Sequence, residues 1–186
     1  MIAEALPSGG KCRIGAVSSS SRAQVNQALQ AAAACYGELL QRALGPNLVS
    51  VVLFGSVARG EAGPNSDIDL LLVGEEFPPG RFARLRLLEP VDAEFEPELD
   101  RLRSRDIHPR LARLLKTRAE AARFVPLYLD LVEDARLLYD RDGFFQSVLA
   151  RLGASLRRLG AERRIRGRIR YWVLKADWTP GEVIEL

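Results

Sequence analysis

Two aspartates, Asp67 and Asp69, stand one residue apart at the start of an otherwise apolar stretch that runs through residue 73. In a strand both carboxylates project to the same face, roughly 6 to 7 Å apart, while Ile68 between them faces the other way. Two carboxylates on one face repel each other unless a cation lies between them. Oxygen ligands select a hard divalent cation, so the pair predicts a site for Mg²⁺ (or Mn²⁺).

A glycine and a serine, Gly55 and Ser56, follow the preceding apolar run at residues 48–54. Gly55 has no side chain where one would block a close approach. Ser56 supplies a hydroxyl and a backbone N–H at the start of a short helix expected over residues 57–59, and such a turn suits a phosphate. The turn and the two aspartates together indicate a nucleoside triphosphate bound as its metal complex.

A plainer interpretation makes residues 64–67 a β-turn and the aspartates solvated turn residues. It explains Asp67, but it leaves Asp69 as an acid inside an apolar strand. We therefore favour the functional interpretation of the pair.

The spacing resembles that of the minimal nucleotidyltransferases of the DNA polymerase β-like superfamily. Their motif is a hydrophobic residue, Gly-Ser, about ten residues and Asp-x-Asp; here Phe54-Gly55-Ser56 precedes Asp67-Ile68-Asp69 by ten residues. The surrounding Gly-Ser-x-Ala-Arg-Gly-Glu and Ser-Asp-Ile-Asp-Leu segments match as well. The resemblance is strong over residues 48–73 and elsewhere follows only the order of elements.

The resemblance implies transfer of a nucleoside monophosphate from an NTP to a hydroxyl of a protein, an RNA or a small molecule, with release of pyrophosphate. Among the NTPs we favour ATP as the donor. The resemblance assigns Asp67 and Asp69 as catalytic metal ligands and Gly55 and Ser56 as binders of the triphosphate. We add Arg59 and Ser66 as candidate binders of the nucleotide phosphates. Arg59 stays open, because it can clamp phosphate or pair with Glu61 or Asp67 to hold the loop. The alternative function is a catalytically weak nucleotide-binding or antitoxin-like module that acts with a helical toxin or another substrate-binding partner.

Active members of the family that this chain resembles usually carry a third carboxylate on the next strand of the sheet, as ligand and general base. The strand expected over residues 107–115 contains no Asp or Glu. Residues 91–95 alternate and would offer Asp92 or Glu94 as a strand, but the apolar spacing through residue 102 favours a helix. The acids of another segment are more typical of a solvated helix face, namely Asp130, Glu133 and Asp134. The sequence therefore does not identify the third carboxylate, and whether the chain is catalytically active stays open.

Helices and strands alternate along the chain. A capping-box pattern at residues 21–24 opens a helix that Gly45-Pro46 ends, and another at residues 117–120 opens a short helix. Further helices are expected over residues 82–102, bent or broken at Pro90, and over 144–159; strands are expected over 48–54, 67–73, 107–115 and 135–139. We predict an α/β (α+β) chain with a mixed sheet, helices packed mainly on one face, and a C-terminal helix and tail. The resemblance makes this the polymerase β-like nucleotidyltransferase fold.

The chain has 186 residues, which suits one substantial core. We expect a flexible leader over residues 1–20, a nucleotidyltransferase domain over 21–143, and a C-terminal helix with a basic and aromatic tail over 144–186, packed on the same domain. No apolar run approaches the ~20 residues that span a bilayer, and residues 1–20 do not form a signal peptide, so we expect a cytoplasmic protein without membrane contact. The single histidine, His108, excludes histidine clusters as metal sites.

Arginines gather near the C-terminus with aromatic residues among and after them: Arg157, Arg158, Arg163, Arg164, Arg166, Arg168, Arg170, Tyr171, Trp172 and Trp178. Basic groups with aromatic faces are what a nucleic-acid groove requires. Charge runs alone are weak evidence, and we favour a solvated helix face that runs into a strand pair whose aromatic residues pack on the domain. Nucleic acid remains open as the acceptor.

Overall fold

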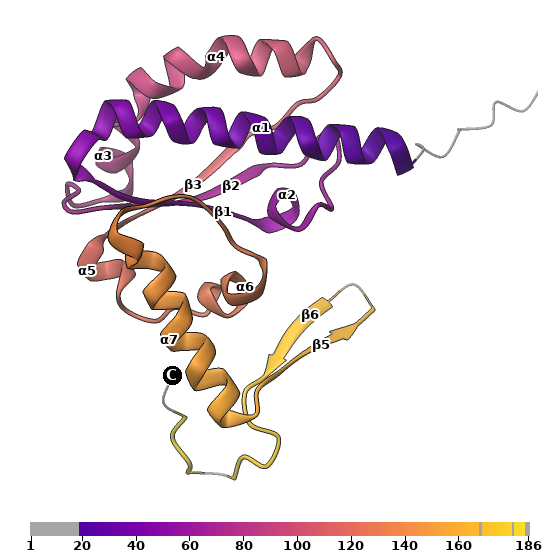
Figure 1. Ribbon diagram of the computed structural model, residues 1–186, viewed down its shortest axis with the longest axis vertical. Coiled ribbons are helices and arrows are strands. Elements are labelled where there is room, and N and C mark those ends of the chain that lie inside the picture. The colour runs from indigo at the N-terminus through magenta and orange to yellow at the C-terminus, as the bar shows by residue number, and fades with distance from the viewer. Residues whose placement is uncertain (1–18, 168, 180, 185–186) are drawn as a thin grey trace, which may run out of the picture.

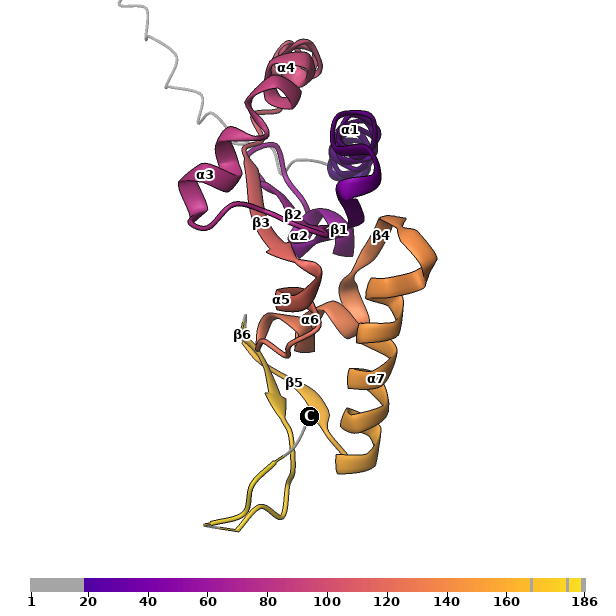
Figure 2. The ribbon, with the colours of Figure 1, turned by 90° about the vertical axis from the view of Figure 1, so that its left-hand side faces the viewer.

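The computed structural model describes residues 19–167, 169–179 and 181–184. Its centre is a mixed four-stranded sheet in the order β3-β2-β1-β4; Figure 1 labels the first three of these strands and Figure 2 labels all four. The strands are β1 (Leu48–Phe54), β2 (Ile68–Gly74), β3 (Leu111–Thr117) and β4 (Arg136–Asp140). β1 is antiparallel to both of its neighbours, whereas β3 is parallel to β2. The α/β class with a mixed sheet is therefore confirmed.

Both faces of the sheet are covered by helices. The central strands are apolar on both sides, with Leu70 and Leu72 in one hydrophobic cluster and Leu71 and Val73 in the other. A strand without polar alternation must be buried on both faces. The expectation that helices pack mainly on one face was therefore wrong in this detail, although the continuous apolar runs already carried the signal.

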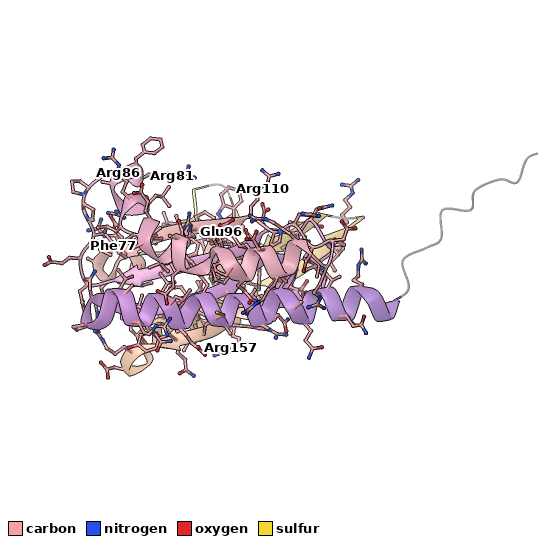
Figure 3. The ribbon with its side chains drawn as sticks, turned by 90° about the horizontal axis from the view of Figure 1, so that it is seen from above. Phe77, Arg81, Arg86, Glu96, Arg110 and Arg157 are labelled. Carbon is pink, nitrogen blue, oxygen red and sulfur yellow. The ribbon has the colours of Figure 1, made fainter. Side chains whose placement is uncertain are left out.

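The first layer consists of α1 (Ser19–Leu44) and α4 (Glu89–Arg103), which lie side by side across the sheet when seen from above (Figure 3). Tyr36 of α1 and Phe95 of α4 meet edge to face with their ring centroids 5.0 Å apart. The short α3 (Arg81–Arg86) lies beside β3 (Figure 2). Pro90 stands in the first turn of α4, where a missing N–H costs nothing, so the expected helix breaks just before this proline.

The second layer consists of α5 (Arg118–Ala121), α6 (Leu127–Asp134) and α7 (Phe144–Leu159). Tyr128 and Phe145 form its aromatic contact, with centroids 5.3 Å apart. The predicted capping box is present: the Glu120 N–H donates to the Thr117 hydroxyl, and the Thr117 N–H donates to the Glu120 carboxylate. Two short 3-10 helices, Gly45–Asn47 and Arg141–Gly143, complete the connections.

β3 begins four residues later than the sequence suggested. Pro109 has no N–H to give to a ladder, and the His108 N–H donates instead to the Pro64 carbonyl of the loop before β2, at 2.7 Å. Residues 107–110 therefore hold this loop in place rather than extend the strand. The helix favoured for residues 91–102 is confirmed within α4, so a strand at Asp92 and Glu94 is excluded.

A separate hairpin of β5 (Glu162–Arg166) and β6 (Ile169–Val173) follows α7 and projects beside α6 (Figures 1 and 2). The expected strand pair after the last helix is thus present, while Arg168 lies outside the described residues. So do residues 1–18 of the expected leader; residues 19 and 20 already belong to α1, and the division into domains remains a prediction. Among the described residues no helix is both long and apolar enough to cross a membrane.

Candidate active site at one end of the sheet

The candidate residues meet where four strand ends converge. Because β1 runs opposite to β2 and β4, and β3 runs with β2, the end of β1 lies beside the beginnings of the other three strands. Phe54 pairs with Asp69, Asp69 pairs with Ala112, and Leu53 pairs with Arg136. Residues from four separated segments therefore face one region.

Gly55 lies directly against Asp69. Its φ of +72° is in the region that favours glycine, and a Cβ built on it would lie 2.0 Å from the Asp69 Oδ2 atom. No other residue fits both the backbone and this approach. The turn after β1 and the carboxylate at the start of β2 therefore form one site.

The two aspartates differ in their surroundings. Asp67 is exposed just before β2, whereas Asp69 is half-buried inside it. Burial raises the pKa of Asp69, the negative charge of Asp67 raises it further, and the Arg59 guanidinium acts in the opposite direction. The pair is thus a place where negative charge is disfavoured unless a cation offsets it.

The segment that follows Gly55 is α2 (Gly55–Arg59), anchored by the buried Val57 and Ala58. The Val57 carbonyl also accepts a hydrogen bond from the Gln30 side chain at 2.9 Å. The first N–H groups of such a turn have no acceptor within it, so those beside Gly55 and Ser56 are available to a ligand. Ser56 itself is half-buried.

The loop between α2 and β2 is fixed by hydrogen bonds. The Gly63 N–H donates to the Ser66 hydroxyl at 2.9 Å, and the Ala62 N–H donates to the buried side chain of Asn26 at 3.2 Å. Ser66 therefore closes the loop, and its contact with phosphate remains a prediction.

Arg59 pairs with acids on two sides. Its Nε donates to Glu61 at 2.8 Å, and its Nη1 lies 3.5 Å from a carboxylate oxygen of Asp134 at the end of α6. Of the two pairings suggested by the sequence, the one with Glu61 is present. The partner beyond the motif, Asp134, has no local sequence signal, because tertiary packing alone brings α6 to α2.

A hollow of about 450 Å³ opens beside Arg59, between α2, α6 and the β5–β6 hairpin. Four arginines and three acids line it: Arg59, Arg136, Arg163, Arg170, Glu61, Glu133 and Asp134. The sequence did not predict that Arg163 and Arg170 line this hollow, because the spacing of arginines in a tail does not indicate where the tail packs.

No third acid joins the aspartate pair from β3. Ala112 is the register neighbour of Asp69, followed on the same face by Leu114 and Lys116. Asp92 instead pairs with Arg113, which faces α4, and Glu94 pairs with Arg42 at 2.8 Å. In the part of the chain that the structure describes, no group of three or more His, Cys, Asp or Glu residues is arranged to hold a metal ion.

The three acids of α6 also have another partner. Arg163 lies 3.5 Å from Asp130, 2.8 Å from Glu133 and 2.6 Å from Asp134. All three acids are therefore paired with one arginine of the hairpin, and among the described residues they form no metal-binding group with Asp69.

Comparison with known proteins adds a family to this geometry. A model described as "Nucleotidyltransferase domain" matches residues 37–138. A curated relative from Methanocaldococcus jannaschii, named "Putative protein adenylyltransferase MJ1305", is 30% identical over 125 residues, which are 66% of this chain and 81% of that protein.

Solved structures resemble the chain more distantly. One, described as a toxin-antitoxin with AMP-PNP, is 17% identical with a TM-score of 0.43 and covers 68% of this chain and 92% of its own. Another, described as the toxin-antitoxin MntA-HepT, is 15% identical with a TM-score of 0.41 and covers 70% and 88%.

Proposed function

Because this chain belongs to the nucleotidyltransferase domain family, a family of transferases, we propose that it transfers a nucleoside monophosphate from an NTP, ATP first, to a hydroxyl acceptor. One observation carries the proposal: Gly55 and Asp69 are in such close contact that only glycine fits between the strand and the carboxylate. A phosphate bound at the turn would therefore lie against the aspartate pair.

The donor set suits a divalent cation. Asp67 and Asp69 offer only oxygen, which Mg²⁺ and Mn²⁺ prefer. Burial, and after it the charge of Asp67, raises the pKa of Asp69, so a bound cation would stabilise the charged form of this carboxylate. We assign both residues as the metal ligands. A metal held by these two carboxylates would supply positive charge for the phosphate oxygens of the nucleotide.

The other residues of the chain orient the nucleotide. The N–H groups at Gly55 and Ser56 donate to phosphate oxygens, and the Arg59 guanidinium offsets their charge. The acceptor oxygen attacks the α-phosphorus, a new O–P bond forms, and the bond to the bridging oxygen breaks to release pyrophosphate.

The acceptor belongs, in this proposal, to a protein. The support is the relative from Methanocaldococcus jannaschii, whose name describes protein adenylylation. Because β3 places Ala112 beside Asp69, the hydroxyl proton passes to a base supplied by the acceptor protein rather than by this strand.

Calorimetry on the full chain tests the nucleotide site. ATP should bind in the presence of Mg²⁺ and lose most of its affinity when the metal is chelated, and Asp69→Asn should behave like the chelated sample. Asp100→Asn, an exposed carboxylate on α4, is the matched control and should bind normally. Equal affinity for ATP in wild type and Asp69→Asn would remove the metal assignment.

A second candidate function is a nucleotide-binding, antitoxin-like module with little turnover. The observation that favours it is the alanine at the register position beside Asp69. Incubation with ATP labelled at the α-phosphate separates the two candidates: transfer of label to a protein supports the enzyme, and binding without transfer supports the module. For the module, Ala112→Asp should raise transfer, because a positioned carboxylate base contributes about 100-fold.

A further inference from the structure

The β5–β6 hairpin presents one of its faces to the candidate site. The register pairs Arg163 with Trp172 and Ile165 with Arg170, so these four side chains share one face, while Arg164 and Tyr171 belong to the other. Arg163 and Arg170 contact the body of the protein on the first face. An isolated two-stranded hairpin is marginally stable in water, so these contacts help to decide where it lies.

Five side chains form a row of alternating charge from one strand of the hairpin to the other. Arg163 binds Asp134 through two hydrogen bonds, of 2.6 and 2.9 Å, and Asp134 also reaches Arg59 at 3.5 Å. Arg59 binds Glu61 at 2.8 Å, and Glu61 accepts from Arg170 at 3.1 Å. Arg59 is therefore the middle member, and each of its two acids is shared with an arginine of the hairpin.

Burial ranks the two halves of the row. The side chains of Arg163 and Asp134 are each only 13% exposed, whereas those of Arg170 and Glu61 are 32% and 45% exposed. Charges that are largely removed from water interact more strongly and are screened less by salt. The Arg163 half should therefore have the larger effect on Arg59.

The shared acids decide how much of the Arg59 charge is available to a ligand. An acid with two arginine partners divides its attraction between them, and an acid that loses one partner draws the remaining arginine fully to itself. Without Arg163, Asp134 would hold Arg59 toward α6 and compete with any phosphate at the turn.

We propose that the β5–β6 hairpin, which lies outside the family-matched residues 37–138, completes the nucleotide site by neutralising Asp134 and Glu61, so that Arg59 stays available to nucleotide phosphates. Arg163 and Arg170 are positioning residues, because they act through these two acids rather than on the nucleotide itself. The proposal rests on the proposed function through the role of Arg59. It names a determinant of nucleotide affinity that the motif does not contain.

Calorimetry with ATP and Mg²⁺ on full-length variants tests the proposal. Arg163→Ala should weaken ATP binding about fivefold to tenfold, because Asp134, the one of its three acid partners that lies 3.5 Å from Arg59, would then draw Arg59 to itself. The double variant Arg163→Ala with Asp134→Asn should recover affinity to within about twofold of wild type, because the competing carboxylate is gone. Arg164→Ala, on the outer face of the same strand, is the control and should bind like wild type.

Recovery distinguishes this role from a merely structural one. If Arg163 served only to dock the hairpin, or touched the phosphates directly, removal of the Asp134 charge would restore nothing, and that result would overturn the proposal. Should Arg163→Ala fail to fold, the more exposed pair Arg170→Ala, alone and with Glu61→Gln, gives the same test with a smaller effect.

The two proposals fail in different ways. If wild-type protein does not bind ATP, the proposed function itself is wrong. If wild type binds ATP but Arg59→Ala or Arg163→Ala binds equally well, the nucleotide site stands and the role of the hairpin is refuted.

Discussion

Arginine and carboxylate side chains form clusters at two places in this molecule. The core cluster joins Tyr36, Asp92 and Arg113 between α1, α4 and β3. The site cluster joins Arg59, Glu61, Asp134, Arg163 and Arg170 beside the aspartate pair. The chemistry is the same, and each cluster borders a hollow, of about 410 Å³ at Asp92 and Arg113 and about 450 Å³ at Arg59. The first cluster connects α1 and α4 to the sheet, whereas the Arg59 charge of the second cluster acts to lower the pKa of Asp69.

The difference shows that an ion pair takes its role from the residues next to it. In the core cluster Tyr36 donates to Asp92 at 2.7 Å and accepts from Arg113 at 2.9 Å, and burial raises the pKa of Tyr36 well above its ordinary value. In the site cluster Asp134 and Glu61 are each shared between Arg59 and an arginine of the hairpin, so either acid can change its partner.

The largest expected effect is on stability, in the core cluster. Arg113→Ala should lower the free energy of unfolding by about 2 kcal/mol, because Asp92 loses its partner while it remains only partly exposed. Urea denaturation measures this loss. ATP affinity should stay at the wild-type value, and a drop in affinity after correction for the folded fraction would show that the two clusters are not separate.

A smaller loss is expected at the hydroxyl of the same cluster. Tyr36→Phe removes two hydrogen bonds but keeps the ring that packs on Phe95, so the free energy of unfolding should fall by about 1 kcal/mol. Thermal denaturation followed by circular dichroism tests this. An unchanged melting temperature would mean that Arg113 and Asp92 need no third partner.

At the candidate site we expect the opposite result, namely that a substitution raises the free energy of unfolding. The pKa of Asp69 is raised, mainly by burial, so its charged form destabilises the fold. The stability associated with protonated Asp69 is complete below its unfolded value of 3.8 and is lost as the pH rises through the folded pKa. Asp69→Asn should therefore stabilise the fold at neutral pH by about 0.5 kcal/mol, a value kept small because the half-buried group is partly screened by water.

Urea denaturation at pH 7 and near pH 3 checks the Asp69 prediction, since the gain should shrink at the acid pH. The same variant should lose Mg²⁺-dependent ATP binding, as a residue kept for function rather than for stability would. If Asp69→Asn instead lowers the free energy of unfolding, the Asp69 carboxylate stabilises the fold, as the residues of the core cluster do.

The smallest effect is expected at Glu61. Hydrogen bonds from Arg170 and Arg59 lower the pKa of Glu61 to about 2, so its stabilising contribution is present above about pH 4.5 and disappears as the pH falls toward 2. Because Glu61 is 45% exposed, Glu61→Gln should cost only about 0.3 kcal/mol at pH 7. Melting temperatures of variant and wild type should converge near pH 2, and a gap that persists there would exclude the ion pairs as its cause.

Much of the fold could be predicted from the sequence, because the local sequence patterns agree with the tertiary packing. The Thr117 and Glu120 capping box, the break before Pro90 and the apolar strands β1 and β2 all follow from residues close together in the chain. The start of β3 was not predicted, because it depends on a hydrogen bond from the His108 N–H to a carbonyl in a loop more than forty residues earlier. The second helical layer was indicated by the continuous apolar runs of β1 and β2, which the expectation of a one-sided sheet overlooked.

The sequence by itself predicted the family, which the family model confirms, and it predicted the two aspartates as metal ligands, because Gly55, Ser56, Asp67 and Asp69 lie within one short motif of a strand, a turn and a strand. Only the tertiary structure decided what surrounds them: Ala112 beside Asp69, Asp92 turned away to Arg113, and Asp134 and Arg163 gathered around Arg59. The physical reason is that a carboxylate or guanidinium is drawn to whichever opposite charge the packing of distant elements leaves within reach. Spacing along the chain does not encode that distance.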